Sequence, residues 1–206
     1  MAHVDLRAEF DVDWTRGDVW RPLGVLQGWV TLRIEGRLII DYEPHAMNPS
    51  AVSLLRTLES DHVATTLDQE DDARWPLFFC CASLWNRCGI VTDFTVRRVD
   101  KHAVLTDFLR CKVPRDTVLR VPWISWVTAV ERLGRRVLRR CPVEKASVRS
   151  RYAKRYGFLR KELKRLLVAA RHQKGRLTAR SSGRSRVRRA LRDKGRARRP
   201  AAERER

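Results

Sequence analysis

The sequence predicts an α+β protein built around an antiparallel β-meander of about six or seven strands. One helix is expected after the third strand, and two amphipathic C-terminal helices and a disordered basic tail are expected after the sheet. Three patterns lead to this fold. They are an alternation of apolar and polar residues near the N-terminus, two adjacent β-branched segments at 90–110, and apolar residues three or four apart over 122–172. We therefore expect a single domain at 1–172, with its sheet in 1–121, and a disordered Arg-rich tail at 173–206.

The first strand is expected at 4–14, where apolar side chains alternate with charged ones without interruption. A period of two is typical of a strand with one solvated face. Two further apolar segments, at 29–34 and 38–42, flank a turn whose Gly36 supplies the unusual backbone angle of a hairpin. The sheet therefore has three predicted strands by residue 43.

A helix is expected to begin at residues 48–50, because proline is tolerated in the first helical turn. Val52, Leu55 and Leu58 then place apolar groups on one side of it. The acidic stretch at 61–74 is interpreted as a solvated loop. A divalent-cation site formed by its carboxylates is the alternative interpretation, although the glycine spacing of a calcium loop is missing.

The sheet is expected to continue with a run at 77–84 that is apolar on both faces, which is typical of a central strand covered by helix. The segment at 90–110 follows and predicts a hairpin that turns at 99–102 and forms the centre of the sheet. A last short strand is expected at 118–121.

Within that hairpin, the residues Thr-Asp-Phe at 92–94 recur at 106–108. A carboxylate repeated on neighbouring strands allows an enzymatic interpretation in which Asp93 and Asp107 act as acid and base. No histidine or second acid accompanies either aspartate in the sequence. Alternating Asp, Thr, Phe and Val is also what a half-solvated strand contains, so the structural interpretation is favoured.

Two amphipathic helices are predicted, of which the first begins at Pro122. In the first, to about 140, apolar residues are three or four apart and the arginines lie mostly on the opposite side. The second is expected at about 146–172 and keeps the same spacing despite an interior Gly157, which costs about 1 kcal/mol. The apolar periodicity stops beyond Gly175, so the rest of the chain is expected to be disordered.

Charge divides the chain into two unequal parts. Residues 1–130 carry 15 basic and 18 acidic side chains, whereas residues 131–206 carry 29 basic and 6 acidic ones. Such asymmetry indicates an acidic partner, which is nucleic acid, an acidic protein surface or an anionic membrane. A GC-rich genome explains the preference for Arg over Lys, but it does not explain the charge of the second part.

Nucleic acid or another polyanion is expected to bind the basic C-terminal region, because clustered Arg and Lys neutralise phosphates and release counterions. Tyr152 and Tyr156 are interleaved with these residues, but we assign them to the apolar stripe of the second helix. The predicted contact residues are Arg149, Arg151, Lys154, Arg155, Arg160, Arg184, Arg186, Arg188, Arg189, Arg192, Arg196, Arg198 and Arg199.

Motifs of specific chemistry are missing. The sequence has no phosphate-binding glycine loop, no paired-His metalloprotease helix and no serine elbow, so no catalytic residue, metal ligand or cofactor is predicted. The odd number of cysteines and the polar N-terminus favour reduced thiols in a cytoplasmic protein without a membrane span. Whether Asp93, Asp107 or the cysteines at 80, 81, 88, 111 and 141 line a ligand pocket stays open.

The sequence therefore predicts a non-enzymatic binding protein that contacts nucleic acid or an acidic protein surface through its basic C-terminus. Its oligomeric state is not predicted. An alternative is a protein-interaction module, because a small antiparallel meander closed by two amphipathic helices resembles many small bacterial proteins. Some of these neutralise toxins as immunity proteins, but the resemblance rests on architecture alone and carries no site residue across.

Overall fold

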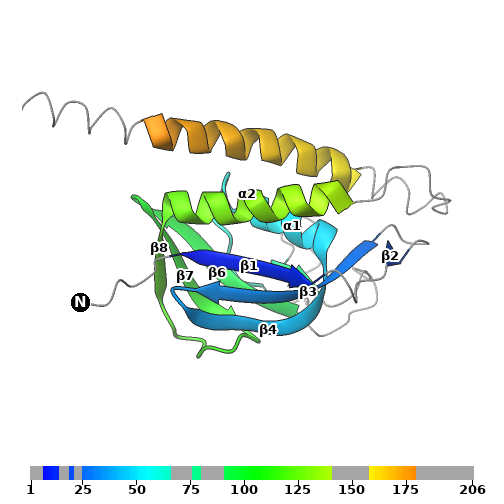
Figure 1. The fold of residues 1–206 in the computed structure, drawn as a ribbon. Coiled ribbons are helices and arrows are strands. Elements are labelled where there is room, and N and C mark those ends of the chain that lie inside the picture. The colour runs from blue at the N-terminus through cyan, green and yellow to red at the C-terminus, as the bar shows by residue number, and fades with distance from the viewer. Residues whose placement is uncertain are drawn as a thin grey trace, which may run out of the picture.

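The structure is a computed structural model that describes residues 7–13, 19–20, 25–65, 76–79, 91–140 and 158–179. These residues form two antiparallel sheets and three helices, which confirms the α+β class (Figure 1). Each sheet has three longer strands and one strand of two residues.

The first sheet contains β1 (Ala8–Asp13), β3 (Val25–Ile34), β4 (Arg37–Ala46) and the two-residue β2 (Val19–Trp20). β1 and β4 both pair with β3, and Ala8 lies opposite Ile34. The predicted hairpin at Gly36 is confirmed, with a φ of 75° at the glycine. Buried and more exposed residues alternate along β1 and β3, as the period of two predicts, whereas β4 breaks the alternation with Ile39 and Ile40 both buried.

The second sheet has the order β5-β6-β7-β8, where β5 is Phe78–Phe79, β6 is Val91–Val99, β7 is His102–Leu109 and β8 is Leu119–Pro122. The hairpin predicted at 90–110 is confirmed, because β6 and β7 pair through their ends at Val99 and His102. These two strands are the middle ones of their sheet.

The prediction of a single meander is corrected, because the strands divide between two sheets. α1 (Met47–Arg56) follows the third predicted strand, which is β4 because β2 had no counterpart in the prediction. The strand expected at 77–84 is also corrected. Its described part is β5, which lies at one end of the sheet order, while residues 80–90 lie outside the described residues.

α1 is buried on all sides and not on one side only, which corrects the prediction for this helix. Every residue from Met47 to Leu55 is buried, including Asn48, Ser50 and Ser53. Asn48 Oδ1 accepts a hydrogen bond of 2.8 Å from the backbone N–H of Leu26 in β3. Polar residues that look like a solvated face therefore lie inside the protein.

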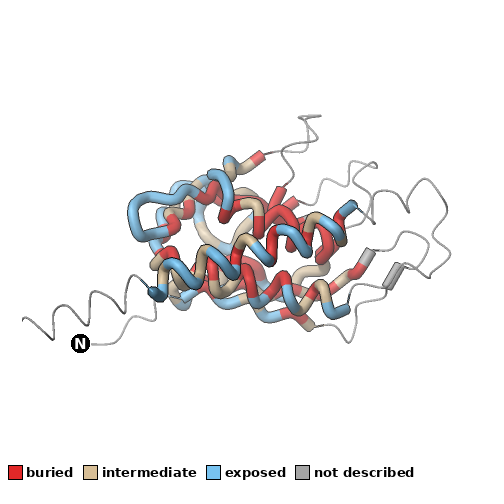
Figure 2. The backbone as a smooth tube through the Cα atoms, turned by 90° about the horizontal axis from the view of Figure 1, so that it is seen from above, coloured by how far each residue is buried: buried red, intermediate tan, exposed pale blue. Residues whose placement is uncertain are grey.

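α2 (Trp123–Arg140) begins one residue later than predicted and lies over the two sheets beside α1 (Figure 1). The indole ring of Trp126 in α2 contacts one aromatic ring of each sheet. Its centroid lies 6.0 Å from that of Phe10 in the first sheet and 6.4 Å from that of Phe94 in the second. Buried residues recur along the inward sides of the helices, and exposed residues lie on their outer sides (Figure 2). α2 thus closes one core between the sheets.

A third helix at 158–179 runs alongside α2 (Figure 1). It matches the second predicted helix, although the predicted first part lies outside the described residues. It also continues past the predicted boundary at 172, which corrects the expected start of the tail at 173. Its buried side chains Leu159, Leu163, Leu166, Leu167 and Ala170 belong to the common core.

At Gly134, α2 packs closely against both α1 and the third helix. A Cβ atom at this position would lie 2.9 Å from Leu55 Cδ1 of α1 and 3.1 Å from Leu167 Cδ2 of the third helix. Both distances are shorter than ordinary van der Waals contact. The missing side chain therefore lets α1 and the third helix pack against the same turn of α2.

Candidate polyanion interface

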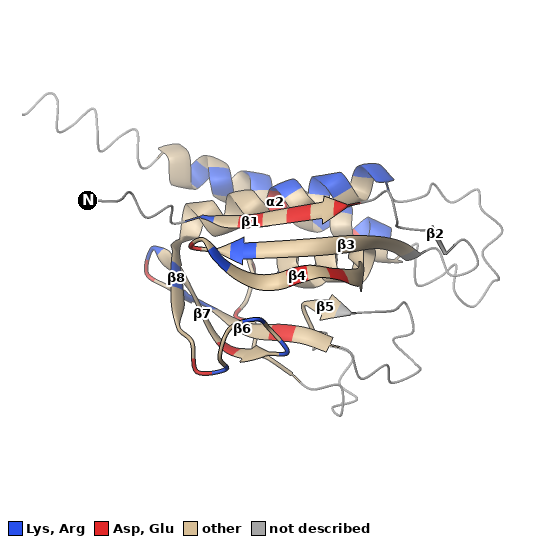
Figure 3. Ribbon diagram, turned by 60° about the horizontal axis from the view of Figure 1, so that its bottom comes forward, with Lys and Arg blue, Asp and Glu red and all other residues tan. Residues whose placement is uncertain are grey.

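α2 and helix 158–179 are rich in Lys and Arg (Figure 3). α2 carries five arginines and one glutamate, and helix 158–179 carries seven basic residues and one glutamate. The described residues of 7–65, which form the first sheet and α1, instead carry four basic and eight acidic side chains. The charge asymmetry of the sequence therefore becomes an asymmetry between two sides of the fold.

Glu131 is the acidic residue of α2, and its carboxylate is paired with basic side chains inside the protein. Its side chain is buried and bonds to Arg135 one turn later. Two cations of helix 158–179 also reach it, Lys174 at 3.2 Å and Arg171 at 3.9 Å. A buried carboxylate needs such partners, so Glu131 fixes the third helix to α2 and offers little negative charge to solvent.

Glu162, the acid of helix 158–179, is also paired. Arg165 donates to it at 2.8 and 3.0 Å, and Arg56 of α1 lies 3.6 Å away. The hydrogen bond from Arg165 holds the pKa of Glu162 below its ordinary value. Arg165 also donates two bonds of 2.8 Å to Glu59, and these two glutamates raise the pKa of its guanidinium.

Several cations on these helices have no ion-pair partner among the described residues. Arg132, Arg139, Lys161, Lys164 and Arg176 are exposed and form no ion pair within the described part of the chain. Charges of this kind meet phosphate or carboxylate groups without first breaking an internal contact. They give the helical side of the molecule positive charge that no ion pair among the described residues neutralises.

Of the predicted contact residues, only Arg160 lies in the described ranges. It is half-buried, and its Nε atom is buried without a hydrogen-bond partner among the described residues. Its role as a contact for nucleic acid or another polyanion stays a prediction. The other twelve predicted residues lie outside the described residues. The arginines of α2 were not predicted as contacts, although their spacing already placed them opposite the apolar stripe.

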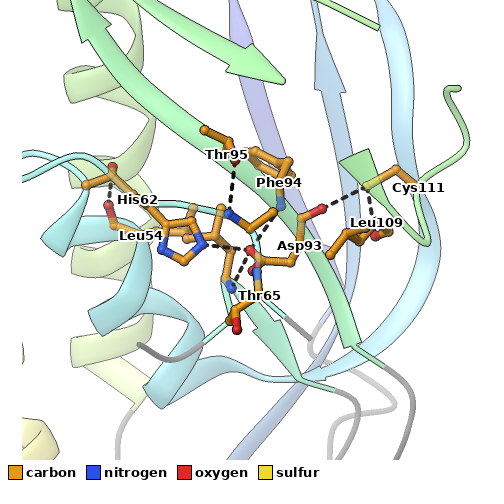
Figure 4. Close-up of polar contacts among 11 residues, drawn as sticks. Leu54, His62, Thr65, Asp93, Phe94, Thr95, Leu109 and Cys111 are labelled. Atoms are coloured by element: carbon orange, nitrogen blue, oxygen red, sulfur yellow. Dashed lines mark hydrogen bonds and ion pairs between the residues drawn. The ribbon is translucent and has the colours of Figure 1, made fainter. Parts of the chain in front are cut away.

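The buried side chain of Asp93 connects several segments of the chain through hydrogen bonds (Figure 4). Its Oδ1 accepts hydrogen bonds from the backbone N–H of Leu77 at 3.0 Å and of Phe94 at 2.9 Å, and its Oδ2 accepts one from Thr65 at 2.9 Å. The ring Nε2 of His62 lies 2.8 Å from Oδ1. These four groups come from three separate segments, so the carboxylate holds β5 and the chain around residues 62–65 against β6.

His62 is the histidine that the sequence did not place beside Asp93, because 31 positions separate the two. A His-Asp pair is a component of general-base sites. Here, however, the carboxylate is fully buried and already accepts several hydrogen bonds. Its role is to satisfy backbone N–H groups that would otherwise be buried without partners.

Asp107 lies in a different environment from Asp93. It is exposed and has a φ of 54°, beside a shift in the pairing of β6 with β7. Hydrogen bonds from Thr95 and Thr106 lower its pKa. One aspartate of the repeat is thus inside the protein and the other outside, so the two do not share one site.

Cys111 is held in its thiol form. Its Sγ donates to the backbone oxygens of Leu109 at 3.4 Å and Asp93 at 3.7 Å. Burial, with the nearby charges of Asp93 and Glu43, raises its pKa to about 12, so little of the nucleophilic thiolate forms near neutral pH. The other four cysteines lie outside the described residues.

No group of three or more His, Cys, Asp or Glu side chains in the described ranges is arranged to hold a metal ion. The helices that the structure describes include none that is both long and apolar enough to cross a membrane. Comparison of the chain with protein-family models, with curated proteins and with solved structures found no match.

Proposed function

We propose that the chain is a non-enzymatic binding protein whose basic C-terminal region holds nucleic acid by its phosphates. One observation supports this proposal most directly. Both acids of the two outer helices, Glu131 and Glu162, are engaged by internal partners, while five exposed cations of the same helices form no ion pair in the described residues. Within the part of the chain that the structure describes, the basic surface is therefore not neutralised by acidic side chains.

The sequence beyond the third helix adds to this charge, because residues 180–206 contain 12 basic and 3 acidic side chains. Contacts to phosphate supply affinity without reading sequence, so we expect binding that is strong at low salt and indifferent to base order. We place this activity in the cytoplasm, since the free thiol of Cys111 suits a reducing compartment.

The proposal is tested by fluorescence-anisotropy titrations of the full-length protein with labelled duplex and single-stranded DNA and RNA at several salt concentrations. If about five phosphates are engaged, log K falls with log salt at a slope near −4.5 on duplex DNA. Replacing Arg184, Arg186, Arg188 and Arg189 with Gln lowers the magnitude of this slope by about one for each contact that is lost. Absence of binding at low salt contradicts the proposal.

The contribution of the folded part is tested with a charge reversal on the third helix. Lys161→Glu with Lys164→Glu weakens binding, because both cations are exposed and form no ion pair in the described region. The matched control is Arg33→Glu with Arg37→Glu, which changes the net charge equally on exposed positions of the first sheet. Equal losses in the two variants would show that only net charge matters and that the helices form no binding surface.

A further inference from the structure

A groove with a volume of about 960 Å³ runs between β1 and the outer side of α2. One wall is residues 7–11, and the other consists of α2 residues between Ile124 and Arg139. Lys174 of the third helix also contributes to the lining. The volume is at the upper end of the range, about 300–1,000 Å³, that is typical of ligand sites.

β1 has a free edge toward this groove, because in the described residues it pairs with β3 alone. The backbone oxygens of Phe10 and Val12 point toward α2, where they accept hydrogen bonds from Arg136 at 3.5 and 3.3 Å. Hydrogen bonds of this length are weak. Among the described residues the edge is covered by one cation, Arg136, whose guanidinium also lies 4.0 Å from Asp11 Oδ1. Once this cation is displaced, such an edge is a template for another strand.

The α2 wall offers positive charge in a regular line. Arg132 and Arg139 are exposed, form no ion pair with any described residue, and lie two helical turns apart on one face, about 10 Å along the axis. Arg136 lies between them. Among the acids of the lining, Glu131 is already paired with Arg135 and Lys174.

The lining is also apolar in part. Ala8 is buried, and Phe10 and Ala129 are half-buried and packed against the core. A ligand for this groove therefore needs negative groups that reach the arginines of α2 and apolar groups that face the core. In an extended chain, alternate side chains point in opposite directions and meet both requirements.

We propose that this groove binds an extended acidic segment of a partner protein, which adds to the free edge of β1 as a further strand. The six residues of β1 span about 20 Å, enough for six residues of the added strand. The backbone of the segment replaces Arg136 on the oxygens of Phe10 and Val12. The released guanidinium then pairs with a carboxylate of the segment, beside Arg132 and Arg139.

One feature favours a protein segment over nucleic acid at this place. A row of backbone oxygens needs N–H donors at the spacing of a strand, which a peptide backbone supplies and a phosphate backbone does not. The carboxylates of Glu9 and Asp11 on the strand wall repel either anion, so the acidic side chains of the segment are expected on its side toward α2. The inference therefore concerns another partner class and another surface than the proposed function.

The test uses the full-length protein and a labelled peptide of roughly ten residues in which Glu and Val alternate. We expect it to bind, and the corresponding Gln-Val peptide to bind at least tenfold more weakly. N-methylation of alternate backbone nitrogens of the Glu-Val peptide also abolishes binding, because it removes the donors that face β1. Unchanged affinity of both altered peptides overturns the proposal.

Two variants of the protein locate the site. Arg132→Glu with Arg139→Glu weakens binding of the Glu-Val peptide at least tenfold. The matched control is Lys112→Glu with Arg120→Glu, at exposed positions that do not line the groove, and it leaves peptide binding nearly unchanged. Thr128→Trp keeps the charge and fills the groove, because Thr128 is a half-buried lining residue of α2. It too abolishes peptide binding. Retained binding in both groove variants overturns the proposal.

The same variants separate this inference from the proposed function when each is also titrated with single-stranded DNA. Thr128→Trp keeps its DNA affinity if the groove is a peptide site. Loss of DNA affinity together with peptide affinity overturns the inference, because the groove would then belong to the nucleic-acid surface. Peptide binding without any DNA binding refutes the proposed function and supports the groove.

Discussion

The indole Nε1 of Trp126 donates a hydrogen bond of 2.9 Å to Thr57 Oγ1, and both residues are buried. The threonine hydroxyl in turn donates to the backbone oxygen of Leu54 at 2.6 Å. Because the same indole meets Phe10 and Phe94, one side chain of α2 joins both sheets to the C-terminal end of α1. The hydrogen bond between Trp126 and Thr57 thus lies beside a cluster of aromatic side chains in the core.

Thr57→Val is expected to lower the free energy of unfolding by about 1–3 kcal/mol, because it leaves the buried indole N–H without its acceptor. Urea denaturation followed by tryptophan fluorescence measures the change. Combined with Trp126→Phe, the two losses are not additive, since the second substitution removes the donor that the first leaves unsatisfied. Strict additivity would show that this hydrogen bond contributes nothing.

Gly134→Ala is expected to destabilise the protein by about 1–3 kcal/mol, although alanine is the better helix former. The added methyl group would lie 2.9 Å from Leu55, a buried side chain that has little room to move. Gly175→Ala on the third helix is the control, because its methyl group would meet nothing within 4 Å. We expect this control to raise the thermal midpoint and Gly134→Ala to lower it.

The lowered pKa of Glu162 makes the stability of the fold depend on pH. Because the folded-state pKa lies below the ordinary value of 4.5, the glutamate stabilises the fold fully above that pH. The stabilisation is lost as pH falls through the lowered pKa. Denaturation midpoints measured from neutral to acid pH should therefore fall less steeply below pH 4.5 for Glu162→Gln than for the natural sequence. Identical acid limbs would contradict this role.

The parts of the fold that depend on neighbouring residues could be predicted from the sequence. The hairpin of β6 and β7 follows from two β-branched segments and a polar turn, and the apolar stripe of α2 follows from its helical period. The end of the third helix was missed because Gly175 resembles a terminating residue. In the structure Leu177 still packs against the core, which keeps the helix continuous beyond the glycine.

Features that depend on distant residues could not be predicted. The position of Asn48 inside the core follows only once β3 presents a backbone N–H to it, and the meeting of His62 with Asp93 requires β6 to lie beside residues 62–65. The excess of basic over acidic residues in the C-terminal part follows from the sequence. The half-burial of Arg160 and the internal pairing of Glu131 arise from tertiary packing and could not be predicted. The other twelve predicted contact residues lie outside the described residues.

The uneven distribution of charge over the fold gives the molecule an electric dipole in its described part. The first sheet with α1 forms the negative end, and α2 with helix 158–179 forms the positive end. In the field of a highly charged polymer, such a molecule turns before contact, so productive collisions present the helices first. The sheet then faces away and stays free to meet a different molecule at the same time.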